Sequence, residues 1–387
     1  MNTAPAAMPP VIWAFLAGNF VIGTGAMMVA GMMNQLASDL QVSVAQAAQL
    51  LTAFAIVCGV GAPIFAAVLT RYSRRTVLTG SLLLYAAGHA LAALTHSYVL
   101  LLAIRAFCGV GAAIFTPQAA AAAGTLVAPA QRGKAVGVVF LGWSAASVVG
   151  VPLGSTIAAT LHWQVAMWGV AGLAVLSAAA VWFYTPASLV AQKVDFAAFM
   201  GVLKDRRVMP VVGVTVLSAT GLFCMFAYLA PLYKTVMGAS PAQISLLFGA
   251  YGLAGLLGSV WMSRNIDRMG AARFVGLCLA STAAVLLAWP LAALGFAAAL
   301  VIALLWGGPG FATNGAQQAR VVGMSGALAP IAVACNSSAI YLGQALGTVI
   351  GGIYYSLAPA LYLPWLAACF VVAAWVLSHA LRTRHNV

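Results

Sequence analysis

The stretch Gly258–Arg273, GSVWMSRNIDRMGAAR, closes an apolar run with a polar turn that holds one acid and three arginines. The stretch Gly61–Thr76, GAPIFAAVLTRYSRRT, stands 197 residues earlier and is also an apolar run followed by a basic turn. At this offset the first glycines of the two stretches coincide, as do Arg71 and Arg268. Such self-similarity predicts that the chain contains two copies of one structural unit.

The same offset aligns further features along both copies. It matches Thr70 with Asp267, Gly111 with Gly308, Gly150 with Gly347, Gly154 with Gly351, and Trp168 with Trp365. The longest polar stretch, residues 186–207, lies between the copies and carries several charges. We therefore expect a first bundle in residues 1–187, a cytoplasmic linker in 188–207 and a second bundle in 208–387.

Each copy contains six apolar runs of about 20 residues, the length that crosses a bilayer as a helix. The composition of 64% hydrophobic and 5% charged residues, with a mean hydropathy of +1.05, suits a protein whose solvent is a bilayer. The sequence predicts an all-α membrane protein with twelve transmembrane helices in two pseudo-symmetric six-helix bundles. The expected spans are Val11–Leu36, Gln46–Leu69, Val77–Leu94, Val99–Gly124, Ala135–Leu161, Val165–Tyr184, Val208–Tyr233, Gln243–Met262, Phe274–Leu294, Gly295–Gly315, Pro330–Ile353 and Ala358–Leu381.

The basic residues are sorted by side of the membrane. If the amino terminus is cytoplasmic, 15 of the 17 Lys and Arg fall in cytoplasmic segments, among them Lys193, Arg320 and Arg384. This positive-inside bias predicts that both termini are cytoplasmic and that the number of spans is even. The net charge of +13 then requires no nucleic acid, because anionic lipid headgroups suffice as partners. The leader Met1–Pro10 has no basic residue, so the first span is expected to serve as an uncleaved signal.

Three motifs resemble those of the major facilitator superfamily. They are the turn Asn265–Arg273 with its counterpart Thr70–Arg75, the run Leu102–Gly111 around an intramembrane arginine, and the glycine–proline pattern Gly142–Gly154. The resemblance runs over essentially the whole chain. It implies the fold of that superfamily and solute transport by alternating access through a cavity between the bundles. It looks closest to the sugar-efflux and arabinose-polymer exporter branch of the drug:proton antiporters, on cues such as Ile340–Gly347.

The charged turns and the glycine–proline pattern are candidates for a conformational switch. A turn that brings an acid and several bases to a helix end can hold one conformation through contacts with the helix dipole. The alternative is a solvated, positive-inside loop. Small residues let helices approach closely and a proline bends its helix, which suits a rocking bundle. The candidate switch residues are Arg71, Arg74, Arg75, Asp267, Arg268, Gly150, Pro152 and Gly154.

The sequence departs from the exporter branch at the group expected to carry protons. Members of that branch have a carboxylate in the first helix just after a Gly-Thr pair, whereas here residues 23–27 read GTGAM. The only acids are Asp39, Asp195, Asp205 and Asp267, and the expected spans place each of them at a helix end or in a loop. Because a buried carboxylate is the usual proton carrier, the sequence favours facilitated diffusion, exchange or coupling through the substrate's own charge.

Arg105 is the basic residue, and His89 the histidine, expected well inside a span. An unpaired charge there costs at least ~2.5–3.5 kcal/mol, so Arg105 needs partners. It either bonds backbone carbonyls or Asp39, or it faces the cavity and receives an anionic or strongly polar substrate. His89 could carry a proton near neutral pH, but its position in the third span favours simple packing.

Polar and aromatic residues on the helices expected to line the cavity are candidates for substrate contact. Asn336 and Gln344 are about two turns apart on roughly one helix face, with Tyr341 between them. Asparagine and glutamine also bond neighbouring helices in membranes, so either role fits. The candidate substrate-binding residues are Asn19, Arg105, Trp143, Phe223, Tyr228, Asn336, Tyr341 and Gln344.

The sequence favours a secondary transporter that exports a small solute, namely a sugar, an amino-acid-like metabolite or an amphipathic drug. The alternative is a facilitated-diffusion uniporter or an anion exchanger that uses Arg105. A membrane-embedded enzyme would need a nucleophile–base set or a metal cluster, and the sequence has neither pattern. The six cysteines fall inside spans as free thiols, and no catalytic residue, metal or cofactor is expected. We expect a monomer in the bacterial inner membrane.

Overall fold

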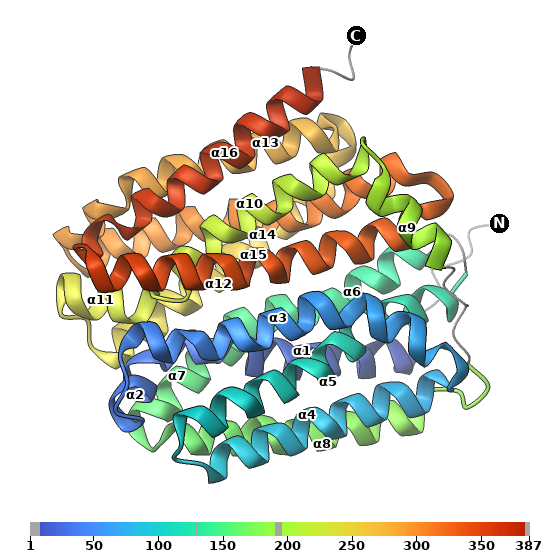
Figure 1. Ribbon diagram of the computed structural model, residues 1–387, viewed down its shortest axis with the longest axis horizontal. Helices are drawn as coiled ribbons and strands as arrows, with labels where there is room; N and C mark the ends of the chain where they lie inside the picture. Colours follow the sequence, from blue (N-terminus) through green and yellow to red (C-terminus); the bar gives the residue numbers. More distant parts are fainter. Residues whose placement is uncertain (1–7, 129–130, 190–195, 384–387) are drawn as a thin grey trace.

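The computed structural model describes residues 8–128, 131–189 and 196–383, and within these ranges the chain is helical with no strand (Figure 1). Eleven spans in these ranges are long and apolar enough to cross a membrane by their own composition. They are α1 (Pro10–Gly31), α3 (Val44–Val68), α4 (Arg74–Leu94), α5 (Tyr98–Thr125), the unit of α6 (Arg132–Ala145), η3 (Ala146–Gly150) and α7 (Val151–Thr160), α8 (Trp163–Tyr184), α10 (Val208–Phe226), α12 (Pro241–Met269), α13 (Ala271–Ala288) with η4 (Trp289–Leu294), α14 (Phe296–Ser325) and α16 (Leu363–Thr383).

A twelfth long helix, α15 (Ala329–Leu357), is not among those eleven. Its apolar surface is interrupted in the middle by Asn336, Ser337, Ser338 and Gln344. Helix α15 runs beside α10 of its own bundle and beside α3 of the other, so protein covers it on two sides. The prediction of an all-α fold with twelve long helices is confirmed, and α15 lies where the bundles meet.

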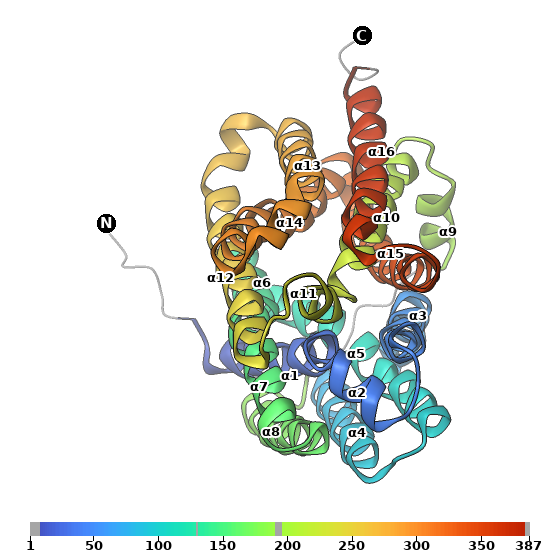
Figure 2. The same cartoon turned by 90° about the vertical axis from the view of Figure 1, so that its left-hand side faces the viewer.

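The two halves pack in the same way. Helices α1–α8 form one bundle and α10–α16 the other, as the view along the helices shows (Figure 2). A side chain on Gly150 of η3 would collide with Thr24 of α1, and one on Gly347 of α15 would collide with Thr220 of α10. Gly150 and Gly347, which the 197-residue offset matched, therefore have the same structural role. Each allows the fifth long helix of its half to pack closely on the first.

The two ends of the molecule differ. We call the end that carries α2 (Met33–Asp39), α7 and α11 (Leu229–Met237) the distal end, and the opposite end, with α9 (Phe196–Lys204), the α9 end (Figure 1). Expected spans are broken near the distal end. The first divides after Gly31 into α1 and α2, and the seventh divides at Tyr228 into α10 and α11.

Contacts between the bundles lie at the distal end and along the middle. At the distal end Thr156 Oγ1 donates a hydrogen bond of 3.1 Å to Ser245 Oγ of the other bundle. Nearer the middle, α12 packs on η3 and α3 packs along α15, where Gly59 leaves room for Leu342. The bundles are thus joined mainly by close packing of helices.

Helix α14 is longer than its apolar run. The run was expected to end at Gly315, but the helix continues to Ser325 and takes Arg320 into the interior, where its Nη1 donates to Ser378 Oγ at 2.9 Å. The end of the expected span at Gly315 was therefore wrong, and Arg320 lies in a helix and not in the connection after it. Hydropathy does not reveal that a helix continues once polar residues begin.

Helix α12 likewise runs into the expected turn. It ends at Met269, so Asp267 and Arg268 lie in its last turn, where both are exposed. Gly270 then stops the helix with φ +77°, in the left-handed region that glycine adopts without strain.

The connector between the bundles contains a helix. Helix α9 occupies much of the linker expected in residues 188–207. Residues 190–195, with Lys193 and Asp195, lie outside the described residues, as do residues 1–7 of the leader and Arg384.

Candidate functional site

The glycine–proline pattern forms an irregular turn at the contact between the bundles. Residues Ala146–Gly150 are a π-helical turn, which the Val151 N–H closes by bonding the Ala146 carbonyl. The next residue, Pro152, has no N–H to donate, and the Ser147 carbonyl packs directly against Gly252 of α12. π-Turns inside α-helices occur often at functional sites. The location of this turn supports a switch role, which stays a prediction for Gly150, Pro152 and Gly154.

The basic turn of the first half packs on aromatic rings. The guanidinium carbon of Arg71 lies 5.0 Å from the Tyr72 ring centroid, and that of Arg75 lies 4.0 Å from the Trp182 ring. The Arg74 backbone N–H donates to the Leu189 carbonyl at 2.7 Å.

The acid of the second-half turn has no such partner. Asp267 forms no ion pair with any base in the described part of the chain. The part of Asp267 and Arg268 in a conformational switch stays a prediction.

Arg105 is fully buried in the first bundle and bonds backbone. Its Nη1 donates to the Gly25 carbonyl at 3.1 Å, its Nε lies 3.5 Å from the Leu50 carbonyl, and its guanidinium carbon is 4.9 Å from the Phe54 ring centroid. Asp39 is exposed at the end of α2. Of the two alternatives for Arg105, the geometry favours bonding to carbonyls over reception of an anion.

His89 is also fully buried within the first bundle. Its ring lies 4.3 Å from the Tyr85 ring, centroid to centroid, and Nδ1 is 3.0 Å from the Tyr85 carbonyl. Cys108 Sγ is 3.6 Å from the same nitrogen. These contacts favour the packing role.

Two of the candidate amides bond neighbouring helices. Asn19 Nδ2 donates to the Val139 carbonyl at 3.1 Å, and Asn19 Oδ1 accepts from Thr116 Oγ1 at 2.8 Å. Asn336 Oδ1 accepts from Thr215 Oγ1 at 2.6 Å. Both amides are fully buried. Asn19 joins α1 to α5 and α6, and Asn336 joins α15 to α10.

Four more candidates are Tyr228, Trp143, Tyr341 and Gln344, and they are all buried or half-buried. Tyr228 is buried, donates to the Thr348 carbonyl at 2.6 Å and stacks on Tyr355 with 5.4 Å between ring centroids. Trp143 is half-buried beside Gly23 of α1. Tyr341 is half-buried and Gln344 is buried on α15. A part of these four residues in solute binding stays a prediction.

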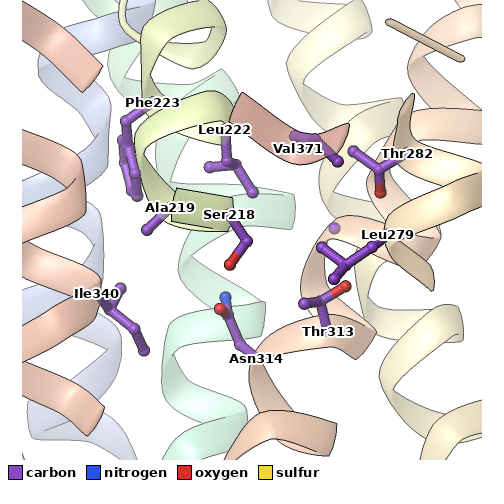
Figure 3. Close-up of a pocket in the computed structure, with 11 residues that line it drawn as sticks. Ser218, Ala219, Leu222, Phe223, Leu279, Thr282, Thr313, Asn314, Ile340 and Val371 are labelled. Carbon is purple, nitrogen blue, oxygen red and sulfur yellow. The ribbon is translucent and has the colours of Figure 1, made fainter. Parts of the chain in front are cut away.

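A pocket in the second bundle combines one predicted residue with several that the sequence reading missed. Its eleven lining residues come from α10, α13, α14, α15 and α16 (Figure 3). They are Ser218, Ala219, Leu222, Phe223, Leu279, Thr282, Gly310, Thr313, Asn314, Ile340 and Val371. Phe223 is the only one of the predicted candidates among them. Asn314 is next to last in the expected span Gly295–Gly315, so the sequence offered little reason to single it out, whereas it lies well inside the observed α14.

The polar groups of this pocket are held by backbone or face the open space. Ser218 Oγ donates to the Thr215 carbonyl at 3.1 Å, and Thr313 Oγ1 donates to the Pro309 carbonyl at 2.7 Å. The Asn314 side chain points toward Ser218 across the pocket, and Leu222 and Ile340 supply apolar walls (Figure 3). Thr282 Oγ1 is buried without a partner among the described residues.

The chemistry of the pocket is uncharged and mixed. None of its eleven lining residues is ionisable, and hydroxyl and amide groups alternate with aliphatic and aromatic surface. Such a lining suits a neutral amphipathic molecule. In this conformation the cavity holds about 20 Å³, room for a water molecule. A solute would therefore need the surrounding helices to separate.

The fold and the bundle contact define a multi-pass helical membrane protein with two pseudo-symmetric halves. The family model described as Major Facilitator Superfamily matches residues 15–329. The chain belongs to that superfamily of transporters, which confirms the family resemblance; the sugar-efflux branch stays a prediction.

Several relatives cover nearly the whole chain. The chain is 26% identical to the inner membrane transport protein YdhP of Escherichia coli over 339 residues, which are 88% of this chain and 87% of that protein. It is 28% identical to a chloramphenicol resistance protein of Streptomyces lividans over 392 residues, 97% of each chain. It is 27% identical to the chloramphenicol efflux pump Rv0191 of Mycobacterium tuberculosis over 367 residues, 92% of this chain and 88% of that one.

Proposed function

We propose that this chain exports a small, uncharged, amphipathic solute by alternating access, and that the pocket around Ser218, Phe223 and Asn314 is part of the solute site. The observation that carries the proposal is the lining of this pocket, with amide and hydroxyl groups beside apolar walls and no charge. The proposal narrows the range of solutes. A zwitterionic amino-acid-like metabolite would bury two charges there without partners.

The direction of transport is proposed from the relatives. Two of them are named for chloramphenicol resistance or efflux. Chloramphenicol is a neutral molecule with an aromatic ring, hydroxyls and an amide, which fits the pocket lining. We therefore propose it as the first solute to test, with neutral sugars as the second group.

The setting of the transporter is part of the same proposal. The protein works as a monomer in the bacterial inner membrane, with both termini in the cytoplasm. The α9 end then faces the cytoplasm, and the bundle contacts at the distal end close the path to the outside. The conformation described here is inward-facing on this proposal.

The energy source does not involve an intramembrane carboxylate. Asp39 and Asp267 are exposed at helix ends, and Asp205 Oδ1 accepts from the backbone N–H of Arg207 at 2.7 Å, just before α10. Asp195 lies outside the described residues. We therefore propose facilitated diffusion or exchange. Anion exchange through Arg105 is disfavoured, because that side chain is fully buried and bonded to carbonyls.

The test is transport of radiolabelled chloramphenicol by the full chain in proteoliposomes, with and without an imposed pH gradient. We expect saturable transport whose rate is the same under both conditions. Empty liposomes give the passive background. If neither chloramphenicol nor a panel of neutral sugars moves above that background, the proposed solute class is wrong. Stimulation by the pH gradient would overturn the proposed energy source alone.

A further inference from the structure

A second hollow lies on the flank of the first bundle, away from the other bundle. It has a volume of about 240 Å³ and is formed where the end of α3 meets α4 and α5. We call it the flank groove and define it by Leu69, Tyr72, Val77, Gly80, Leu84 and Ile114, with Thr76 and Ser81 completing its lining. Helix α4 lies at the periphery of the molecule, on the side of the first bundle away from the second (Figure 2).

Gly80 is what keeps the flank groove open. It is exposed on α4, and a side chain added there would meet no atom within 4 Å. Val77 and Ile114 are buried and form the floor, while Leu69 and Leu84 are partly covered walls. The flank groove is therefore an apolar hollow on a surface that otherwise carries long aliphatic side chains.

The second half of the molecule fills the equivalent place. At the 197-residue offset, Leu277 stands for Gly80, Phe274 for Val77 and Phe311 for Ile114. Phe274 is buried, and its ring packs on that of Trp261 with 4.9 Å between centroids. The repeat therefore places bulkier side chains at these three positions of the second half than at the matching positions of the first.

The mouth of the flank groove is strongly basic. Tyr72 lines the groove, and the exposed Arg71 guanidinium lies 5.0 Å from its ring centroid. Arg74 and Arg75 follow in the next turn, and the stretch Gly61–Thr76 contains no acid, because Thr70 stands where the second half has Asp267. Guanidinium groups bind phosphate in a planar, two-pronged geometry, and basic clusters beside membrane helices attract anionic headgroups.

We infer that the flank groove binds one anionic phospholipid, with an acyl chain against Gly80 and the headgroup phosphate at Arg71. The apolar groove and the exposed Arg71 guanidinium at its mouth together match the two parts of such a lipid. This site is separate from the solute pocket of the second bundle and does not depend on the solute.

The test is native mass spectrometry of the purified full chain, with phosphatidylglycerol or phosphatidylcholine of the same acyl chains added in turn. The wild-type protein should retain phosphatidylglycerol about fivefold more than phosphatidylcholine, as expected for one arginine contact. Gly80→Leu, which copies the second half, should reduce retention of both lipids. Arg71→Gln should reduce phosphatidylglycerol to the phosphatidylcholine level.

Matched variants separate the groove from general effects of the substitutions. Gly172→Leu adds the same bulk at another exposed glycine with open space, on α8, and Arg268→Gln removes the charge equivalent to Arg71 in the second half. Both controls should retain lipid as the wild type does. Equal retention of the two lipids by the wild type, or equal losses in Gly80→Leu and Gly172→Leu, would overturn the assignment. Thermal unfolding of each variant verifies that it is folded.

Discussion

At the scale of single residues, Arg105 illustrates how a charge is kept inside a membrane without a counter-ion. Two carbonyls from α1 and α3 and the face of Phe54 surround its guanidinium. We predict that Arg105→Ala lowers stability by about 1–3 kcal/mol, because the hydrogen bonds that join α5 to α1 and α3 through the guanidinium are lost. Arg105→Lys should lose less, since an ammonium keeps the charge but not the planar fork. Thermal unfolding of the purified variants measures both effects.

The same variant separates the two alternatives for this arginine. If it only joins helices, solute KM should stay near the wild-type value in whatever fraction of Arg105→Ala folds. If Arg105→Ala is as stable as the wild type and its KM is strongly raised, Arg105 would instead contact the solute.

Asn314 carries the residue-scale prediction for the solute pocket. Its amide points into the pocket from α14, so Asn314→Ala should remove one hydrogen bond to a bound solute (Figure 3). We expect KM for transport to rise about two- to tenfold, the effect of a hydrogen bond worth about 0.5–1.5 kcal/mol. Asn265→Ala is the control, because that amide is near the end of α12 and bonds the Trp261 carbonyl. Equal KM values in the two variants would speak against the pocket.

At the scale of elements, the contact between α12 and η3 sets how closely the bundles approach. A methyl group on Gly252 would lie 2.5 Å from the Ser147 carbonyl oxygen, whereas one on Gly249 would lie 3.6 Å from Pro152 Cγ, an ordinary contact. Gly252→Ala should therefore hold the distal end open, and Gly249→Ala should not. Spin labels at the exposed positions Thr160 and Ala242 report the separation. Identical distance distributions in the two variants would show that the contact does not control closure.

Sequence predicts the elements better than it predicts which side chains meet. Runs of apolar residues gave the positions of the long helices, and the repeat gave their grouping. The break at Tyr228 left no mark in hydropathy, because the residues on both sides of it are apolar. The break after Gly31 lies only a few residues before the expected end of the first span at Leu36. The continuation of α14 past Gly315 was missed for the opposite reason, since its last turns are polar although partly buried.

The candidate site was harder to predict for a physical reason. In a membrane helix every face is apolar, so periodicity does not tell which face lines a cavity. Asn19 and Asn336 are predicted substrate ligands that each also bond a neighbouring helix, and the sequence does not tell the two roles apart. Asn314 has the same chemistry and faces a pocket, and only the packing of α10 and α13 around it makes the difference.

At the scale of the whole molecule, the distribution of basic residues predicts its orientation in the membrane. Fifteen of 17 Lys and Arg lie in segments that share a side with the termini if the spans are twelve. A fluorescent protein fused after the last residue should therefore be fluorescent, and alkaline phosphatase at the same place inactive. Insertion after Leu161, between α7 and α8, should give the reverse. The opposite pattern would place the α9 end outside the cell, and the conformation would then be outward-facing.

The contacts between the bundles bear on the free-energy difference between the conformations of the protein. In the described residues no ion pair crosses between the bundles. A hydrogen bond from the Thr156 hydroxyl to the Ser245 hydroxyl joins them, beside helices that pack closely at glycines. To turn a 1:99 ratio of two states into 99:1, a ligand needs about 5.5 kcal/mol of differential affinity. On the proposed alternating-access mechanism, contacts of this kind would keep the difference in free energy between the two states small, so that solute binding alone could shift the balance.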